Sequence, residues 1–436
     1  MHNPEHNQAL ASRSAIATDS ADQTGNRVSG TGADDTIRLL YLTAEQWPTF
    51  RQDLVALFGK YLPRFGIQAD LVTEQEAATA ELPPWGGGAV MLCKVPRQRA
   101  AQYLLKLGHN LKTLWSCNPA RYQAIQVRDM TVSAWFGLMT ARRHGLRFYY
   151  WLSFPQSEGQ IARAQARGPG SGLRFWFPLL QGWFGKWLLY RIVLPAADHI
   201  FVQSVQMKQD LLARGIPAAR MSPVPMGIDL ENLPATSAGA MPDPRLQNRP
   251  VLVYLGTLDP ARQIDILLEM LAIARKQKPD LLLVLVGDTE DAGHRQWLRD
   301  ESRRLELEEQ VIFTGWLPIS DAWQYVRSAS IGLSPFPRGP LLDSASPTKA
   351  VEYLALGLPV IVNDNPDQKR MIEESQAGLC VPLTAQAFAD AALQLLNNPS
   401  LRQTMAQRGR EYAHQHRSYA HIASELASIY HALQRH

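Results

Sequence analysis

The chain has 436 residues, of which 46% are apolar, and its formal charge at pH 7 is +4. This length is enough for two domains of ordinary size, and the apolar fraction can supply a core to each of them. The net charge is small and no Lys/Arg block dominates, so the charge distribution does not indicate a nucleic-acid-binding protein.

The cysteines and the apolar segments indicate in which cellular compartment the protein is expected. Cys93, Cys117 and Cys380 have neither metal-ligand nor disulfide spacing, which is typical of a reducing environment. The first residues lack the apolar segment of a signal peptide. No uninterrupted apolar run is long enough to span a membrane. The sequence therefore predicts a cytoplasmic protein.

The first half of the chain alternates strand and helix patterns. Residues 1–35 are polar and are expected to be a disordered tail. A strand is predicted at 37–42, followed by a helix from about 52 to 65 that Gly66 ends. Further strands are predicted at 69–72, 89–92, 124–127, 148–151 and 199–202. This rhythm predicts a parallel sheet in an N-terminal domain over 36–233.

The second half repeats the same alternation after a linker. Residues 234–249 are polar and rich in Pro, Ala and Gly, as expected of a linker. A second Rossmann-like domain is predicted over 250–411, and 412–436 is predicted to contain a terminal helix. Its strands are expected at 251–256, 282–287, 311–315, 331–334 and 359–362.

The segment 160–197 combines cations and aromatic rings without any acidic residue. Such a mixture suits the interface of a membrane, where rings lie at headgroup level and cations meet anionic lipid. A buried helix with a basic rim explains the same composition equally well. Gly182, Gly185 and Pro195 argue against a membrane span.

The most informative segment is 346–362, which predicts a helix followed directly by a strand. Ser346 is expected to cap the helix and Pro347 to occupy its first position. Gly357 ends the helix, and Pro359 prevents its continuation.

The start of this helix has the features of a phosphate site. Its free N–H groups, its positive dipole end and Lys349 together favour an anion. Thr348 and Glu352 share one helix face. The backbone N–H groups could bind phosphate, and the carboxylate of Glu352 behind them could bind ribose hydroxyls. This arrangement suits a nucleoside diphosphate. The alternative is an ordinary capped helix with a solvated Glu352.

The segment resembles the donor-binding signature of family 4 glycosyltransferases, which have the two-domain GT-B fold. Glu352, Ala355, Gly357, Pro359 and the Val-Ile pair that follows match that signature. The resemblance implies a donor domain over 250–411, an acceptor domain over 36–233, and a terminal helix that crosses back onto the acceptor domain. It implies parallel sheets facing across a cleft.

The sequence departs from the signature at its first Glu. Ser344 stands at that position, with Asp343 beside it, and the usual Gly-Phe-Gly is replaced by Ala345-Ser346-Pro347. A Ser-Pro-x-Lys variant also occurs in such transferases. Ser344 is kept among the expected donor-binding residues, but this position lacks the carboxylate by which the first Glu would contact the donor sugar.

Other donor contacts are expected at the carboxyl ends of the second domain's strands. Gly256 would let a ligand approach the backbone, and Arg262 could clamp the diphosphate. Thr257 replaces a family Arg, for which Lys349 is a substitute. A surface Arg at a helix start is the other interpretation of Arg262.

Two further turns are expected to hold the base and ribose through their backbone. They contain Gly287 and Gly315, with Trp316 next in the chain. Trp316 would either flank the base or pack beneath the loop.

The first domain lacks two features that the resemblance leads one to expect. No Gly-Gly loop follows its first strand, and the strand at 148–151 leads into Ser153 instead of the family His. Arg128 and Asp129 follow another predicted strand, in the region of the expected cleft. They could be a structural ion pair, a solvated edge of the sheet or part of the site. No catalytic acid or base is assigned here.

The sequence as a whole predicts a glycosyltransferase that uses a UDP- or GDP-hexose, with Arg262 and Lys349 as its catalytic cations. No Asp-x-Asp motif is present, so neither metal nor cofactor is expected. The resemblance implies retention of configuration, a glycan or lipid-linked acceptor, and a role in cell-surface polysaccharide or glycolipid assembly. The alternatives are a catalytically silent GT-B subunit that binds nucleotide sugar or a partner protein, and a GT-B sugar-nucleotide epimerase.

Overall fold

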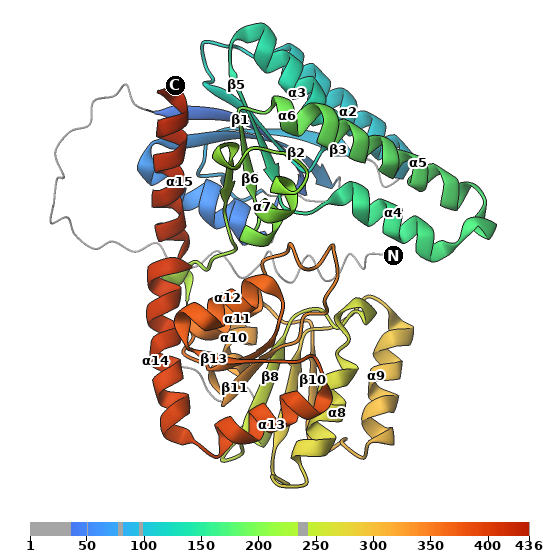
Figure 1. The fold of residues 1–436 in the computed structure, drawn as a ribbon, viewed down its shortest axis with the longest axis vertical. Coiled ribbons are helices and arrows are strands. Elements are labelled where there is room, and N and C mark those ends of the chain that lie inside the picture. The colour runs from blue at the N-terminus through green and yellow to red at the C-terminus, as the bar shows by residue number, and fades with distance from the viewer. Residues whose placement is uncertain (1–35, 50, 77–81, 96–98, 234–242, 436) are drawn as a thin grey trace, which may run out of the picture.

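A computed structural model describes residues 36–49, 51–76, 82–95, 99–233 and 243–435. These residues form two Rossmann-like bodies, one above the other in Figure 1, and each is built on a parallel sheet. The fold class predicted from the sequence is confirmed. The expected disordered tail, 1–35, and residues 234–242 of the expected linker lie outside the described residues.

The upper body holds a seven-stranded parallel sheet. In sheet order its strands are β3 (Val90–Val95), β2 (Ile67–Glu76), β1 (Ile37–Gln46), β4 (Ala124–Arg128), β5 (Arg147–Leu152), β6 (His199–Val202) and β7 (Met221–Pro223). Successive residues of β1 enter different cores, because Leu39 and Tyr41 join one buried cluster while Leu40 and Leu42 join another. The sheet is therefore covered on both faces, as the apolar runs of parallel strands require.

Helices connect these strands. They are η1 (Asp53–Tyr61), η2 (Leu62–Phe65), α2 (Arg99–Trp115), α3 (Thr131–His144), α4 (Gln156–Arg167), η3 (Pro169–Ser171), α5 (Leu173–Leu188), η4 (Leu189–Val193), α6 (Leu194–Ala196), α7 (Val205–Leu212) and η5 (Ala218–Arg220). Two short turns, η6 (Leu230–Asn232) and η7 (Pro244–Leu246), lie between the sheets in sequence.

The lower body holds a six-stranded parallel sheet. Its strands in sheet order are β10 (Val311–Gly315), β9 (Leu282–Val286), β8 (Val251–Leu255), β11 (Ile331–Ser334), β12 (Val360–Asn363) and β13 (Gly378–Val381). The connecting helices are η8 (Pro260–Arg262), α8 (Asp265–Ala274), α9 (Ala292–Arg304), α10 (Ile319–Arg327), α11 (Thr348–Ala355), α12 (Pro366–Ser375), α13 (Ala385–Leu396) and α14 (Pro399–His416), and α15 (Tyr419–Gln434) ends the chain.

Two strands and one helix break were not predicted. β7 has three residues and ends in a proline, and β13 begins with a glycine, so neither shows a strong strand pattern. The terminal helix, expected from about residue 412, is two helices, because α14 ends at His416 and α15 begins after Ser418 caps it.

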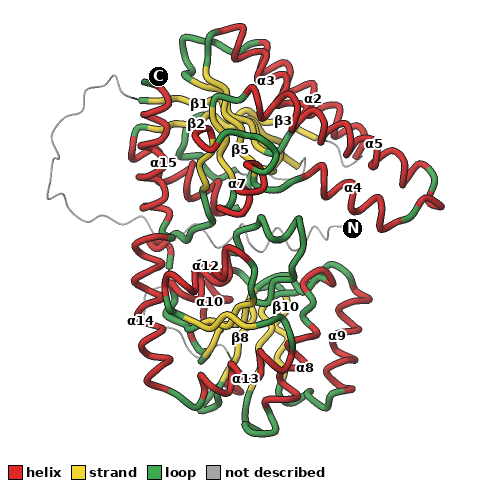
Figure 2. The backbone as a smooth tube through the Cα atoms, in the orientation of Figure 1, coloured by secondary structure: helices red, strands yellow, loops and turns green. Residues whose placement is uncertain are grey.

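The chain passes between the two bodies twice, and the two passages are bonded to each other. Ile228 N–H donates to the Arg417 carbonyl at 2.8 Å, and Tyr419 N–H donates to the Ile228 carbonyl at 2.9 Å. Beyond this bridge α15 packs on η1 and η2, with Tyr419 and Tyr430 in the core of the upper body. Figure 2 shows the green connecting segments that meet between the bodies.

The helices α4 and α5 form a hairpin that projects from the upper body, on the side opposite α15 in Figure 1. Glycines let them approach, because a Cβ at Gly182 would lie 2.7 Å from Ile161 Cγ1, and one at Gly185 would lie 2.7 Å from Ser157 Oγ. Among the described residues, no helix has both the length and the apolarity to cross a membrane.

Candidate functional site

The helix predicted after Ser346 is α11, and it begins one residue later than predicted. Pro347 occupies the capping position and supplies no side-chain acceptor to the first turn. The prediction that Ser346 caps the helix is wrong. Its hydroxyl accepts a hydrogen bond from Met226 N–H at 3.0 Å and donates one to Asp367 Oδ2 at 2.7 Å.

The physical reason is the proline. Pro347 is itself extended, with φ −68° and ψ 126°, so the helix starts at Thr348 and Ser346 lies one residue before the capping position. A buried carboxylate is also a strong acceptor for its hydroxyl. The first turn of α11 is consequently left without a side-chain cap, with Gly357 at φ 75° beyond its other end.

Lys349 extends from this first turn to the carboxyl end of β8. Its Nζ lies 3.9 Å from the centroid of the Tyr254 ring. A Cβ at Gly256 would lie 3.3 Å from the same nitrogen. The space that glycine leaves open is therefore filled on this side by the ammonium, which stands between α11 and the end of β8.

The ammonium of Lys349 is enclosed and lacks a close counter-charge. No described carboxylate or carbonyl hydrogen-bonds it, although the residue keeps partial solvent access. Burial and the nearby charge of Arg262 hold the pKa of Lys349 well below its usual range, and Glu352 only partly offsets them. An incoming anion would relieve this repulsion.

Glu352 lies one turn further along α11 and faces a tryptophan that the sequence did not single out. Trp323 Nε1, from α10, donates to Glu352 Oε2 at 3.0 Å. Burial raises the pKa of Glu352, while bonds from Trp323 and Thr348 and the charge of Lys349 oppose the rise. The interpretation of Glu352 as a freely solvated residue is wrong. Nothing in the sequence around Trp323 indicated that its ring N–H would meet Glu352.

Three glycines bring the ends of neighbouring strands into close contact. Gly256, Gly287 and Gly315 have φ values of 143°, 130° and 71°. A Cβ at Gly287 would lie 2.1 Å from the Gly256 carbonyl oxygen. Only glycine fits at Gly287, and Gly256 is the one of the three that approaches Lys349.

Thr257 and Trp316 lie next to these glycines. The Thr257 carbonyl accepts a hydrogen bond from the Tyr254 hydroxyl at 3.0 Å. Trp316 is 43% exposed, so it is not packed beneath the loop, and its ring is open to a ligand or solvent.

Arg262 ends the short turn η8 that follows β8. Its Cζ lies 5.2 Å from the centroid of the Phe336 ring, a cation–π contact. It forms no ion pair with any described carboxylate, and its charge acts on Lys349 and on the Tyr254 hydroxyl. Arg262, Lys349, Thr348, Glu352 and Gly256 are thus gathered at one end of the second sheet.

Ser344 is the predicted site residue that lies apart from this group. It is buried, and its carbonyl accepts a hydrogen bond from Ser204 Oγ of the upper body at 2.7 Å. Its own hydroxyl donates to the Leu341 carbonyl at 3.3 Å. Ser344 therefore joins the two bodies, and nothing in its contacts replaces a carboxylate directed at a donor sugar.

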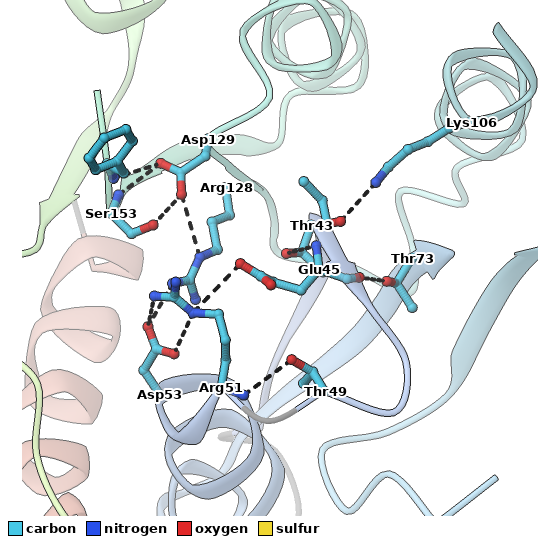
Figure 3. Close-up of polar contacts among 12 residues, drawn as sticks. Thr43, Glu45, Thr49, Arg51, Asp53, Thr73, Lys106, Arg128, Asp129 and Ser153 are labelled. Atoms are coloured by element: carbon cyan, nitrogen blue, oxygen red, sulfur yellow. Dashed lines mark hydrogen bonds and ion pairs between the residues drawn. The ribbon is translucent and has the colours of Figure 1, made fainter. Parts of the chain in front are cut away.

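A second polar cluster lies at the carboxyl ends of strands of the first sheet (Figure 3). Arg128 is buried at the end of β4, and its Nη2 lies 2.6 Å from Asp53 Oδ2. Asp53 also binds Arg51 at 3.0 Å. The two arginines outweigh the effect of burial and hold the pKa of Asp53 well below its usual range.

Asp129 occupies the same edge in a left-handed conformation, with φ 55°. It accepts the backbone N–H of Ser153 at 2.8 Å and the Ser153 hydroxyl. Burial raises the pKa of Asp129 despite Arg128 beside it. The interpretation of Arg128 and Asp129 as a structural pair is half right, because the closer partner of Arg128 is Asp53.

The ion pairs and hydrogen bonds of Arg51, Asp53, Arg128 and Asp129 fix the positions of these charges at the edge of the first sheet. Asp53 carried no signal in the sequence beyond its place at the start of an apolar helix. Within the described ranges, no three His, Cys, Asp or Glu side chains gather where they could hold a metal ion.

Two protein families match the two bodies. The family described as Glycosyl transferase 4-like domain matches residues 55–227, and Glycosyl transferases group 1 matches residues 242–412. Together they cover every strand of the two sheets except β1. The chain belongs to the family 4 glycosyltransferases.

Curated relatives match about half of the chain. A phosphatidyl-myo-inositol mannosyltransferase of Mycobacterium tuberculosis is 27% identical over 213 residues, which are 48% of this chain and 53% of the relative. A GDP-mannose-dependent alpha-(1-6)-phosphatidylinositol monomannoside mannosyltransferase of the same species is 27% identical over 235 residues, 52% of this chain and 60% of the relative.

Solved structures share the whole two-body fold. Sucrose-phosphate synthase from Thermosynechococcus elongatus superposes with a TM-score of 0.68 at 20% identity, over 91% of this chain and 99% of that one. HepE from Anabaena, in complex with UDP, has a TM-score of 0.65 at 17% identity, over 91% and 100%. At these identities the likeness establishes the GT-B fold alone.

Proposed function

We propose that this protein transfers a hexose from a UDP- or GDP-sugar to a glycan or lipid-linked acceptor, with retention of configuration. The observation that carries the proposal is the pair of cations, Arg262 and Lys349, beside the uncapped first turn of α11, neither of which forms an ion pair with a described carboxylate. Glu352 stands behind them at the distance of one helical turn, suited to ribose hydroxyls. The relatives' names, mannosyltransferases in both cases, point the same way.

The chemistry follows from where negative charge grows. As the sugar–phosphate bond breaks, the nucleoside diphosphate gains charge, and it meets two cations and the N–H groups of the helix start. These groups bind the departing diphosphate more tightly than the intact donor, which lowers the barrier. Because cations and amides suffice for this step, we propose that transfer does not depend on a metal ion.

The acceptor is proposed to be reached at a membrane surface, at the inner face of the cell membrane. Along α5 the rings of Trp176, Phe177, Trp183, Phe184 and Trp187 are all more than half exposed. The segment 160–197 adds five cations and no acidic residue. Rings at headgroup level and cations against anionic lipid fit this composition. Assembly of a cell-surface polysaccharide or glycolipid would use such an acceptor.

One observation favours the rival function of a silent subunit that binds nucleotide sugar. The position of the first family Glu is taken by Ser344, whose carbonyl is bonded to Ser204. A protein with the diphosphate site but without a contact to the sugar would bind a donor and transfer nothing. The epimerase alternative has no comparable observation in its favour.

The deciding experiment uses the purified full chain with radiolabelled UDP- and GDP-hexoses and a membrane lipid extract as acceptor. Label that moves into lipid, with EDTA causing no loss, supports a metal-independent transferase. Donor binding without transfer or hydrolysis supports the silent subunit, and isomerised sugar nucleotide supports the epimerase. A Lys349→Met variant controls for contaminating activity, because it removes a proposed catalytic cation.

A further inference from the structure

A cavity of about 640 Å³ lies between the α4–α5 hairpin, α7 and the loop that leads to α11. Its volume is within the range of about 300–1,000 Å³ that small-molecule sites occupy. Arg262 and Lys349, the cations of the proposed diphosphate site, do not line it. It is therefore distinct from the group around Lys349 and Arg262, although Ser344 of the loop before α11 belongs to its lining.

The lining of the cavity is mainly hydrocarbon. Ile161 and Ala162 come from α4, Trp183 from α5, and Met207 and Leu211 from α7. Leu152 closes the inner end where β5 stops. A cavity of this composition gains most by burying an apolar chain, because each methylene removed from water contributes about 0.8 kcal/mol.

Several charged groups at the cavity have partners, and the lining includes the carboxylates of Glu158, Asp210 and Asp343. Arg214 Nη2 lies 3.8 Å from Glu158 Oε1 and its guanidinium stacks 4.3 Å from the Tyr190 ring centroid. Asp343 binds Arg338 at 2.7 Å. Lys186 is different, because it contacts the Trp183 ring at 5.3 Å and forms no ion pair with any described residue. The Lys186 ammonium is thus available to bind a phosphate beside the apolar cavity.

The cavity is continuous with the exposed aromatic face of α5. Trp183 lines the cavity and is also 53% exposed. Trp187, one helical turn further along α5, is equally exposed. A chain leaving a bilayer against this face would therefore meet the cavity without crossing water.

The remaining wall belongs to the other body. Pro340, Leu341 and Ser344 lie in the loop before α11, and Ser204 holds this loop through its bond to the Ser344 carbonyl. Lys349 follows Ser344 by five positions. A chain in the cavity would thus brace the segment that carries the proposed diphosphate site.

We propose that this cavity binds the hydrocarbon chain of a membrane-derived, phosphate-linked acceptor lipid, with Lys186 near its phosphate. The inference rests on the proposed function, since it names the chemical class of the acceptor. The chain would lie between both bodies, so its binding would stabilise the position of the loop before α11.

The test uses the full chain and a benzophenone analogue of farnesyl phosphate, in buffer without lipid. Photolabelled peptides are mapped by mass spectrometry, and affinity is measured by calorimetry with farnesyl phosphate itself. Label is expected in α4, α7 and 340–344. Label confined to the outer face of α5 would overturn the proposal, because it would indicate simple adsorption on exposed rings.

A matched pair of variants tests the cavity directly. Ala162→Phe fills it from α4, whereas Ala166→Phe adds the same ring to an exposed position of the same helix that does not line it. Affinity for farnesyl phosphate is expected to fall about 10–200-fold in the first variant only. Equal affinity in both variants would overturn the proposal, and so would competition by inorganic phosphate alone.

Two further measurements separate this inference from the proposed function. Binding of anionic vesicles is expected to be the same for both variants, because the outer face of α5 is intact. Thermal stabilisation by UDP- or GDP-sugars reports the donor site independently. Farnesyl phosphate binding without any donor binding would leave the cavity assignment standing and refute the transferase, whereas the reverse result would refute the cavity assignment alone.

Discussion

Ser346 Oγ donates a hydrogen bond to Asp367 Oδ2 over 2.7 Å, and both residues are buried where the two bodies meet. The other oxygen of Asp367 accepts from Arg417 Nη2 at 2.9 Å, and Arg417 lies at the break between α14 and α15. Met226, from the first passage between the bodies, donates to the Ser346 hydroxyl. One carboxylate therefore ties the segment before the proposed donor helix to both passages of the chain.

Replacing Asp367 by Ala should destabilise the fold strongly. Arg417 is buried, and removing its partner leaves an uncompensated charge, which typically costs about 3–5 kcal/mol. The free energy of unfolding, measured in urea, checks this. Asp364→Ala is the matched control, because Asp364 is half exposed, pairs with Arg338 at the surface, and should cost at most about 1 kcal/mol. Similar losses for both variants would contradict the central role of Asp367.

Glu352→Ala should remove most of the thermal stabilisation by a UDP- or GDP-sugar. A lost hydrogen bond to a charged group costs about 1.5–3 kcal/mol of binding. Because burial raises the pKa of Glu352, donor affinity should also fall as the pH is lowered through that raised value. Calorimetric titration at several pH values measures both effects. Unchanged nucleotide affinity in the variant would refute the ribose contact.

Lys349→Met should weaken diphosphate binding and yet stabilise the free protein. Burial and Arg262 lower the pKa of Lys349 in the fold, so the unfolded chain binds more protons between that value and the ordinary one. The destabilisation of the fold by the charge of Lys349 is therefore largest at low pH, and it decreases as the pH rises from the lowered pKa towards the ordinary one. Urea unfolding of both proteins should differ most at the acidic end, by about 0.5–2 kcal/mol.

Donor binding should show the opposite dependence on pH. The diphosphate prefers the charged ammonium, so affinity should decline as the pH rises through the lowered pKa of Lys349. The variant should lack this decline. If the wild-type affinity stays constant up to the pKa of an ordinary lysine, the account of an enclosed ammonium is wrong.

Arg262→Ala should reduce turnover at saturating donor more than it reduces donor affinity. The charge that Arg262 meets grows as the diphosphate leaves, and losing such a partner typically lowers the rate about 10²–10³-fold. Arg299→Ala is the matched control, since Arg299 also stacks on a phenylalanine, Phe313, at 5.1 Å. Steady-state rates of the two variants decide. A raised donor KM with unchanged turnover would make Arg262 a binding residue only.

Trp176→Ser with Trp187→Ser should weaken attachment to anionic vesicles. Both rings are more than half exposed on α5, and each buried aromatic ring contributes about 1.5–3 kcal/mol to partition. Trp297→Ser is the control, because Trp297 is 45% exposed on α9 of the other body. Vesicle co-sedimentation measures the difference. Equal loss in all variants, or none, would contradict a membrane face on the hairpin.

The strand and helix pattern predicted most of both sheets, because parallel strands buried on two faces leave clear apolar runs such as Val251–Leu255. β7 and β13 lacked such runs and were missed. At the site, the sequence pointed to Lys349, Glu352 and Arg262, but it assigned Ser346 to the wrong partner. That partner, Asp367, lies twenty-one positions away in sequence, and Trp323 and Asp53 likewise meet their partners only through the tertiary fold.

The hydrogen-bonded pair of passages at Ile228 and Ser418 limits how the halves can move. We expect these two adjacent attachments to resist separation and sliding of the bodies, so that a rotation about the line through them would first have to break the hydrogen bond from Ser204 to Ser344. Ser346 and Asp367 lie close to that axis through Met226 and Arg417, so a swing would barely displace them. The α4–α5 hairpin projects on the far side of the molecule (Figure 1). A rotation about that axis would therefore move the tip of the hairpin further than it moves Ser346 or Asp367.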